Sequence, residues 1–278
     1  MIKRTKRRLS KSFLLVCFFL LSLSLSSCSF GAIRHLDAVN DPKTTLIVGL
    51  DDTFVPMGFR EKNGQIVGFD VDLAKATAKK LGQKIAFQAI DWNMKETELR
   101  NGTIDLIWNG YTKTPEREKQ VAFSQSYLNN RQVLVTLKKN HIRSFADMKD
   151  KKLGLQNGSS GQTLFEQQPR VLKNIVAGKT AVLYDNFNTA FLDLQAGRTQ
   201  GVLGDSIYAG YYIRQQKDPS AYQITTGGFS GETFAIGMRK QDTKLKQRLD
   251  QALDELRRDG TIARLSQKWF KQDLTVKP

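Results

Sequence analysis

From Thr44 onward the chain alternates between two hydrophobic periods. Short runs of β-branched and apolar residues, for example at 46–50 and 85–90, predict strands. Between them, apolar residues recur at spacings of three and four across 71–81, which predicts a helix that ends at Gly82. This alternation of strands with helices is typical of βαβ units with parallel sheets.

The same pattern restarts in the second half of the chain. The elements predicted there are, in order, an extended run at 132–137, a short helix at 145–151, a strand at 152–156, helices near 162–168 and 188–196, and a strand at 200–203. Leucines at 245, 249, 253 and 256 line one face of a C-terminal helix, and we expect Thr261 to cap the last helix. The sequence thus predicts two α/β units without an internal repeat.

The first 27 residues have the pattern of an export signal. Six basic residues and no acidic residue precede an apolar run at 13–25, and its length of about 13 is below the roughly 20 residues that span a membrane. The run ends at Leu25-Ser26-Ser27-Cys28, which resembles a bacterial lipobox, where the cysteine is diacylated and the chain is cut before it. We therefore expect a lipoprotein signal peptide at 1–27, and a lipidated Cys28 with a tether at 28–43. A plain secretory signal or an uncleaved anchor is the alternative.

Removal of this segment changes the charge balance. The net charge of +16 falls to +10 when the six basic residues of the signal peptide are removed. The other basic residues are mixed with acidic ones, which is typical of a solvated surface near an anionic envelope and not of a nucleic-acid site. Hydrophobic residues make up 40% of the chain and charged residues 25%, as in ordinary globular proteins. Because Cys17 lies in the signal peptide and Cys28 carries lipid, we expect no intramolecular disulfide.

The sequence has few of the residues and motifs expected of metal sites or of the common enzyme classes. Its two histidines, His35 and His141, lie in the predicted tether and in a basic stretch, so they do not suit a His-rich metal site. The sequence has no nucleophile elbow, no Walker A loop and no dinucleotide-binding fingerprint. We therefore expect no catalytic residue, no metal and no cofactor, although a catalytic pair of carboxylates would need no motif.

Polar side chains instead follow several predicted strands, at the places where open α/β sheets bind ligands. These positions are Asp51, Asn109, Thr112, Ser159, Ser160 and Asp205. In addition, Thr114-Pro115-Glu116 is a strong helix start, and Arg117 follows it. A guanidinium and the amides of a helix start suit a carboxylate, while an aspartate suits an ammonium, so the set suits a zwitterion. The same residue types also occur as ordinary helix caps and solvated charges, and this alternative stays open.

Five motifs follow one another between residues 44 and 270. They are Gly68-Phe69-Asp70-Val71-Asp72-Leu73-Ala74 with Leu81-Gly82, the stretch 112–117, the stretch 121–127, the stretch 145–154, and Asp259-Gly260-Thr261 with Lys268-Trp269-Phe270. In this order they resemble the motifs of the polar amino-acid solute-binding proteins of ABC importers, family 3 of the bacterial extracellular solute-binding proteins. The resemblance covers essentially the whole predicted mature chain.

The resemblance implies a two-lobe α/β fold of the type II periplasmic-binding-protein kind, with two crossovers and a cleft that closes on a ligand. Lobe 1 would comprise residues 44–130 plus 231–278, and lobe 2 residues 131–230. The implied function is to capture a polar amino acid and deliver it to the permease subunits of an ABC importer. We expect a monomer that its lipid holds at the outer face of the cytoplasmic membrane, outside a Gram-positive cell.

The resemblance also assigns the ligand-binding residues. It implies that Arg117 clamps the ligand α-carboxylate and that Asp205 takes the α-ammonium. Asp51, Phe54 and Trp92 would line the side-chain pocket, although the two aromatic residues also suit an ordinary core. The whole predicted set is Asp51, Phe54, Trp92, Asn109, Gly110, Thr112, Arg117, Gln156, Ser159, Ser160 and Asp205.

Departures from the family pattern leave the ligand and some functions open. The chain has Trp108-Asn109-Gly110-Tyr111-Thr112 and Ala122 where many relatives carry other residues. A neutral polar amino acid fits the predicted pocket better than a basic one, although Asp51 also suits a cationic side chain or the far end of cystine. Two alternative functions remain. One is a dehydratase-like enzyme, for which Glu232 is the extra acid, and the other is an adhesin or sensor domain on the same fold.

Overall fold

The computed structural model describes residues 45–277, which belong to one compact unit. The predicted signal peptide at 1–27, the lipidated Cys28 and the tether at 28–43 lie outside the described residues. Among the helices of the described part, none combines the length and the apolar character needed to cross a membrane.

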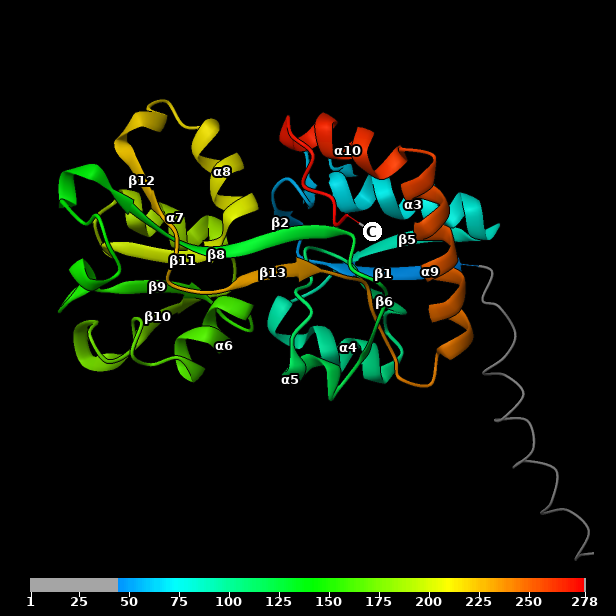
Figure 1. Cartoon of the computed structure of the whole chain (residues 1–278), viewed down its shortest axis with the longest axis horizontal. Coiled ribbons are helices and arrows are strands. Elements are labelled where there is room, and N and C mark those ends of the chain that lie inside the picture. Colours follow the sequence, from blue (N-terminus) through cyan, green and yellow to red (C-terminus); the bar gives the residue numbers. More distant parts are fainter. Residues whose placement is uncertain (1–44, 278) are drawn as a thin grey trace, which may run out of the picture. The chain divides into compact units, whose positions relative to one another are not determined.

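The first sheet has five strands in the order β5-β1-β6-β14-β7 (Figure 1). They are β1 (Thr45–Leu50), β5 (Lys84–Ala89), β6 (Leu106–Ile107), β7 (Ala122–Phe123) and β14 (Gly237–Met238). β1 pairs in parallel with β5 and β6, whereas β14 runs antiparallel to β6 and β7. The helices of this part are α3 (Phe69–Leu81), α4 (Lys95–Asn101), α5 (Pro115–Glu118), α9 (Thr243–Arg258) and α10 (Thr261–Phe270), with a 3₁₀ turn at Trp92–Met94. Helices α3, α9 and α10 lie on one face of the sheet and α4 on the other (Figure 1).

The alternation of side chains along β1 explains these two layers. Leu46 and Val48 point into the core under α3, where they join Phe69. Ile47 points to the opposite face and packs with the cluster that contains Leu99 of α4. A sheet covered on both faces needs apolar residues at every position of its central strand, which is the pattern at 46–50.

The second sheet has six strands, in the order β10-β9-β11-β8-β12 with β13 also paired to β8. They are β8 (Leu128–Leu137), β9 (Leu153–Gln156), β10 (Ala181–Tyr184), β11 (Gly201–Asp205), β12 (Tyr222–Thr225) and β13 (Gly231–Phe234). Its helices are α6 (Ser160–Gln167), α7 (Phe187–Gln195) and α8 (Ser206–Arg214), and four 3₁₀ turns lie at Lys138–Asn140, Ala146–Met148, Ala177–Lys179 and Pro219–Ala221. Helices α7 and α8 lie on one face and α6 on the other (Figure 1). Each sheet with its helices is called a lobe below.

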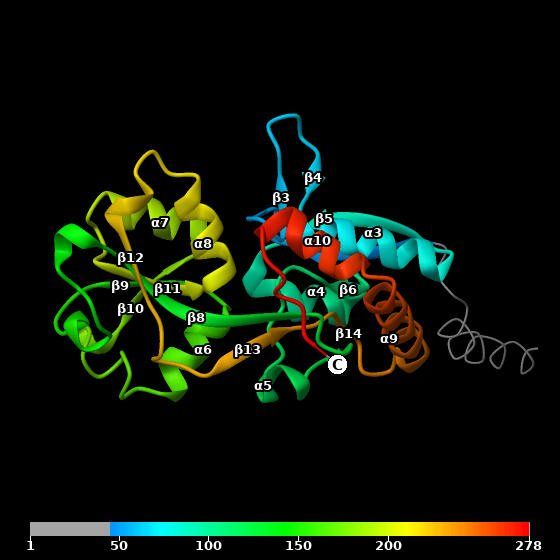
Figure 2. The ribbon, with the colours of Figure 1, turned by 45° about the horizontal axis from the view of Figure 1, so that its top comes forward.

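A small third sheet joins the two lobes through an aromatic contact. It consists of β2 (Thr53–Phe54), β3 (Gly58–Arg60) and β4 (Ile66–Val67), and Figure 2 shows the β3–β4 hairpin projecting from the first lobe. At its start, Phe54 packs on Tyr208 of α8 with ring centroids 5.5 Å apart and on Phe187 of α7 at 5.9 Å. One apolar core therefore continues from the first lobe into the second.

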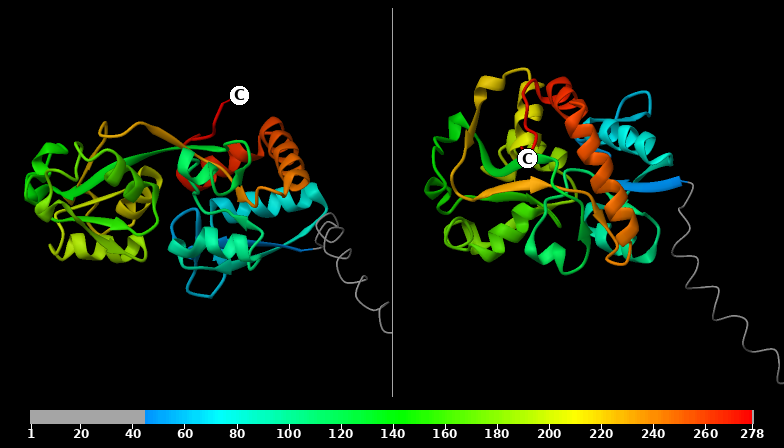
Figure 3. Two further views of the ribbon diagram at one scale, coloured as in Figure 1. Left: turned by 90° about the horizontal axis from the view of Figure 1, so that it is seen from below. Right: turned by 45° about the vertical axis from the view of Figure 1, so that its right-hand side comes forward.

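The chain passes between the lobes twice, from β7 to β8 and from β13 to β14. These two connections run side by side, because β13 pairs antiparallel with the first half of β8 (green and orange in Figure 3). The predicted lobe boundaries at 130 and 231 fall within β8 and at the first residue of β13, and they stay a prediction.

The predicted α/β architecture is confirmed, and so are several of its signals. Gly82 ends α3 in the left-handed conformation, with φ of 65°. Thr114 caps α5, because its side chain accepts a hydrogen bond from the Arg117 amide. The sheets are mixed and not wholly parallel, since strands that return from the other lobe enter antiparallel.

Two local predictions are wrong. Thr261 does not cap the last helix: it is the first residue of α10, and Gly260 stands at the N-cap with φ of 74°. The chain turns directly from α9 into α10 there, so no extended residue precedes the helix. The helix predicted at 145–151 is only the 3₁₀ turn Ala146–Met148, because the chain breaks at Asp150, whose φ is 56°.

Candidate functional site

One cavity lies where the carboxyl ends of β1 and β6 meet those of β9 and β11. Its volume is about 270 Å³, including the space open to solvent at its mouth. All eleven residues of the predicted set line it: Asp51, Phe54, Trp92, Asn109, Gly110, Thr112, Arg117, Gln156, Ser159, Ser160 and Asp205. The structure therefore brings together residues from both lobes that lie up to 154 positions apart in the sequence.

A buried guanidinium stands at one end of this cavity. Arg117 is in the first turn of α5 and is only 7% exposed. Its Nη1 donates to the Thr112 carbonyl at 2.9 Å, and its Nη2 donates to the Gly158 carbonyl at 3.0 Å. The guanidinium also lies 4.5 Å from the ring centroid of Tyr111, as a cation–π pair. These two carbonyl contacts hold the guanidinium in place. They leave one N–H on Nη1 and one on Nη2 to bind an anion.

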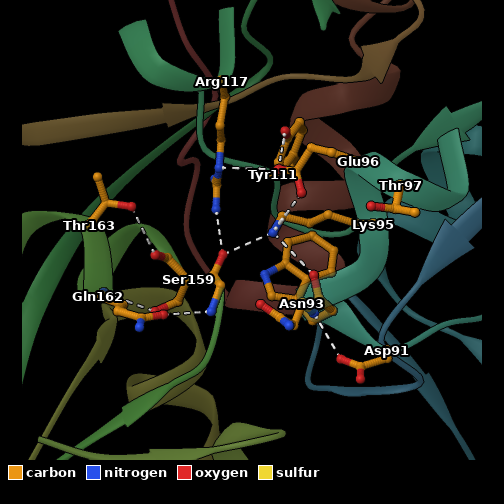
Figure 4. Close-up of polar contacts among 12 residues, drawn as sticks. Asp91, Asn93, Lys95, Glu96, Thr97, Tyr111, Arg117, Ser159, Gln162 and Thr163 are labelled. Carbon is orange, nitrogen blue, oxygen red and sulfur yellow. Dashed lines mark hydrogen bonds and ion pairs between the residues drawn. The ribbon is translucent and has the colours of Figure 1, made fainter. Parts of the chain in front are cut away.

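A second buried cation reaches the same carbonyl (Figure 4). Lys95 of α4 is 2% exposed, and its Nζ donates to the carbonyls of Trp92 at 3.1 Å and Gly158 at 2.9 Å. Its Nζ lies 3.2 Å from Oε2 of Glu96, and the other oxygen, Oε1, accepts a hydrogen bond of 2.8 Å from the Tyr111 hydroxyl. Burial, and next the charge of Arg117, lowers the pKa of Lys95 to about 8.

The start of α6 lies beside this guanidinium. Ser159 is the N-cap, and its hydroxyl accepts a hydrogen bond of 3.1 Å from the Gln162 amide. The Ser160 hydroxyl lies 3.2 Å from the Thr112 hydroxyl of the other lobe. A helix start presents amide groups and a positive dipole end, which together with Arg117 makes this end of the cavity suit an anion.

A carboxylate under the cavity holds the loop after β6. Asp70 of α3 accepts a hydrogen bond of 2.7 Å from the Gly110 amide, and burial raises the pKa of Asp70 to about 7. Gly110 has φ of 57°, and a Cβ at this position would lie 2.6 Å from the Phe54 ring. Only glycine fits there without strain, so Asp70 and Gly110 together set the path of the cavity wall.

An acidic group lines the same cavity, and Gln132 links it to Ser160 at the start of α6. Asp205 ends β11, is 6% exposed and lines the cavity. Its Oδ1 accepts a hydrogen bond of 3.0 Å from Gln132 Nε2 and another from Asn130 Nδ2. Burial, and next the charge of Glu232, raises the pKa of Asp205 to about 7. This carboxylate suits a cation.

The third part of the cavity contains a second acidic group. Asp51 Oδ2 accepts a hydrogen bond of 2.9 Å from Gln156 Nε2, and its Oδ1 accepts one of 2.6 Å from the Thr53 hydroxyl. Burial raises the pKa of Asp51. Asn109 Oδ1 accepts a hydrogen bond of 3.1 Å from the Asp51 amide, while Asn109 Nδ2 is buried with no hydrogen-bond partner among the described residues. Phe54 and Trp92 belong both to the core and to the cavity wall.

Sequence reasoning missed the residues that support this cavity without lining it. Lys95, Glu96, Asn130 and Gln132 were not predicted, because charged residues in a first helical turn and polar residues in a strand are ordinarily solvated. Glu232 was noted only as an extra acid. Among residues 45–277, no group of three or more His, Cys, Asp or Glu side chains is placed to hold a metal ion.

Comparison with known proteins gives this cavity its context. Residues 46–272 match the model of the bacterial extracellular solute-binding proteins, family 3. A solved substrate-binding protein of an ABC uptake transporter from Streptococcus pneumoniae, with bound histidine, is 48% identical with a TM-score of 0.83, covering 84% of this chain and 95% of that one.

Two curated relatives from Escherichia coli strain K12 are similar over most of their length. The ABC transporter arginine-binding protein 1 is 31% identical over 91% of this chain and 98% of its own. The L-cystine-binding protein TcyJ is 32% identical over 90% of this chain and 91% of its own. The family match confirms the resemblance seen in the motifs and the two-lobe fold that it implies: this chain belongs to the bacterial extracellular solute-binding proteins, family 3.

Proposed function

We propose that this protein captures a polar amino acid between its two lobes and delivers it to the permease of an ABC importer. The observation that carries this proposal is the set of charged groups that line the cavity. A buried guanidinium, a helix start and a buried carboxylate all line it, and Gln132 bonds both Ser160 of that helix start and Asp205. A free amino acid carries a carboxylate and an ammonium on one carbon, and these are the two charges that such neighbouring groups attract.

Residues that line the cavity can pair with each charge of the ligand. Arg117 and the amides at the start of α6 would hold the α-carboxylate, and Asp205 would hold the α-ammonium. Asp51 would receive the side chain, together with Phe54 and Trp92 in the wall. Since an ionised carboxylate only accepts hydrogen bonds, Asp51 favours a side chain that ends in an N–H donor, whether neutral or cationic. The relatives named above are binding proteins, and we propose that this chain too performs no chemistry on its ligand.

Contacts between the lobes link binding to delivery. The Gly158 carbonyl of the second lobe accepts from both Lys95 and Arg117 of the first, and Gln156 reaches across to Asp51. A ligand that bridges the same groups would stabilise this arrangement over one with the lobes apart. The permease would then recognise the closed, loaded form.

We also propose that Cys28 carries the membrane anchor and that the protein acts as a monomer on the outer face of the cytoplasmic membrane, in a Gram-positive envelope. Two acyl chains, at about 0.8 kcal/mol for each buried methylene, hold a protein firmly while its body stays in water. Relatives in this family are extracellular or periplasmic binding proteins, which agrees with export.

Ligand screening tests the proposed function. The full chain in detergent is heated with each proteinogenic amino acid and with cystine, and thermal unfolding is followed. A ligand at about 100 times its Kd adds about 2.7 kcal/mol, which raises the Tm of a domain of this size by roughly 5–10 °C. We expect a shift of this size with at least one polar amino acid. No shift with any of them would contradict the proposal.

Arg117→Ala tests the carboxylate clamp. Loss of a charged, two-pronged contact is expected to weaken binding at least about 100-fold, or about 2.7 kcal/mol, in isothermal titration calorimetry. Arg198→Ala is the matched control, because this exposed arginine pairs only with Asp193 in the described residues, away from the cavity. Affinity of Arg117→Ala within about threefold of the wild type would exclude the assigned clamp.

Lys95→Met tests the contact between the lobes. The change removes a buried charged donor to the Gly158 carbonyl but keeps an unbranched side chain of similar length. We expect the ligand to dissociate about tenfold faster, equivalent to about 1.4 kcal/mol, in stopped-flow measurements. Lys113→Met, an exposed lysine of the same lobe, is the control and is expected to leave the rate unchanged. An unchanged rate in Lys95→Met would show that this contact does not retain the ligand.

Cys28→Ala tests the lipid anchor. We expect the variant to move from the membrane fraction to the medium when cells are fractionated, because the acyl chains have no other thiol outside the signal peptide to join. Cys17→Ala, inside the signal peptide, is the control and is expected to stay in the membrane fraction. A membrane-bound Cys28→Ala would instead indicate an uncleaved anchor.

A further inference from the structure

Two carboxylates meet on one face of β8, and only one of them lines the cavity. In the antiparallel ladders of this strand, Asn130 stands opposite Glu232 of β13, and Gln132 stands opposite Asp205 of β11. Residues two apart in a strand share a face, so Asn130 and Gln132 point the same way with their partners beside them. The register of β8 therefore places both acids next to each other.

The two acids share their hydrogen-bond donors. Gln132 Nε2 donates to Asp205 Oδ1 at 3.0 Å and to Glu232 Oε2 at 2.9 Å. Asn130 Nδ2 contacts the same two oxygens, at 3.2 Å for Glu232. One acceptor atom from each carboxylate thus lies within hydrogen-bond reach of the same two nitrogens, which holds the two acids side by side.

Few other groups offset the charge of this pair. Ser160 of α6 offers its hydroxyl to Glu232 at 3.4 Å, and Ser206 of α8 binds Asn130 rather than an acid. Arg117 of α5 is the charged group whose field reaches both carboxylates, but it forms no ion pair of 4.0 Å or less with either among the described residues. Burial raises the pKa of both acids, and the charge of Glu232 raises that of Asp205 further.

We propose that Asp205 and Glu232 form one acidic unit, which holds a proton while the cavity is empty and releases it to solvent when the ligand's ammonium group arrives. Asp205 touches the ammonium, and Glu232 is a positioning residue that acts through Asp205. In the step, the carboxyl O–H bond breaks, the proton passes to water, and the new carboxylate pairs with the ammonium. This inference rests on the proposed function, since it needs an amino-acid ligand.

The direction of the pH effect follows from the charges. An ammonium beside Asp205 favours the ionised carboxylate, so the pKa of the unit is lower in the bound state than in the empty one. Binding therefore releases a proton when the pH lies between these two values. Affinity rises by up to about tenfold per pH unit in that window, and it levels off above the raised pKa of the empty site.

Calorimetry of the full chain in detergent measures the released proton directly. Titrations with L-arginine, and with L-glutamine, are run at about pH 6 in buffers of different ionisation enthalpy, and Kd is measured from about pH 5 to 8.5. Neither probe titrates at about pH 6, so a proton released there comes from the protein, and the uptake by the probe's own amino group near pH 8.5 is subtracted. We expect release approaching one proton at about pH 6 and nearly none at about pH 8.5.

Glu232→Gln separates this role from a structural one. The amide keeps the shape and removes the neighbouring charge, so we expect the released fraction at about pH 6 to fall by at least half. The bend of the affinity profile should move to lower pH, while Kd at about pH 8.5 stays within about threefold of the wild type. Glu166→Gln, an exposed carboxylate of α6, is the control and should leave the profile unchanged.

Each outcome decides the proposal. Binding by the wild type without proton release, or an unchanged pH profile in Glu232→Gln, would overturn the acidic unit and leave the binding function intact. If Glu232→Gln fails to fold, the proton count of the wild type with L-glutamine, whose neutral side chain brings no charge to Asp51, still decides the first part. Absence of binding of both probes and of every other amino acid at all pH values would overturn the proposed function, and the acidic unit with it.

Discussion

The Gly158 carbonyl accepts hydrogen bonds from two buried cations, Lys95 and Arg117, which both come from the other lobe. A buried charge without partners costs several kcal/mol, so each cation needs carbonyls or carboxylates around it. Lys95 has Glu96 and two carbonyls, and Arg117 has two carbonyls, the Tyr111 ring and the same Glu96, whose Oε1 lies 3.9 Å from its Nε. The loop between β9 and α6 is therefore part of the environment that makes both cations tolerable, and the position of the lobes depends on it.

The same requirement shapes what the cavity can accept. A guanidinium has five N–H donors, and the two carbonyls of Thr112 and Gly158 use only one on each terminal nitrogen. The donors that remain form a fork, and the amides at the start of α6 lie beside it. Beyond the start of α6 the acids are held by side-chain amides, which donate hydrogen bonds without cancelling charge. A zwitterion supplies both of the charges that these groups attract.

The sequence predicted the residues that end strands, but not the residues that support them. Asp51 and Asp205 follow or end buried strands and Arg117 follows a Thr-Pro helix start, so periodicity and capping signals were enough to propose them. Glycine at 110 and the Asp70 carboxylate lie 40 positions apart, and only the fold reveals that one holds the other.

Other elements were missed because their local pattern is weak. Helix α8 buries Ile207, Tyr208 and Tyr212 and has no long polar face that would mark a helical period. The strands β2 and β4 are two residues long, which is below the length at which alternation can be recognised. In β8, Asn130 and Gln132 have the spacing of a solvent-facing side, and only pairing with β11 and β13 places acids beside them.

The shared motifs explain why the class of ligand is easier to infer than its side chain. Arg117, which we propose holds the α-carboxylate, lies in a motif common to the family, and the relatives named above are binding proteins for amino acids as different as histidine, arginine and cystine. Selection among side chains must therefore depend on positions outside the motifs. In this chain Asn109 is one such position: its Oδ1 accepts a hydrogen bond from the Asp51 amide, so its side chain helps to position an acid that lines the cavity.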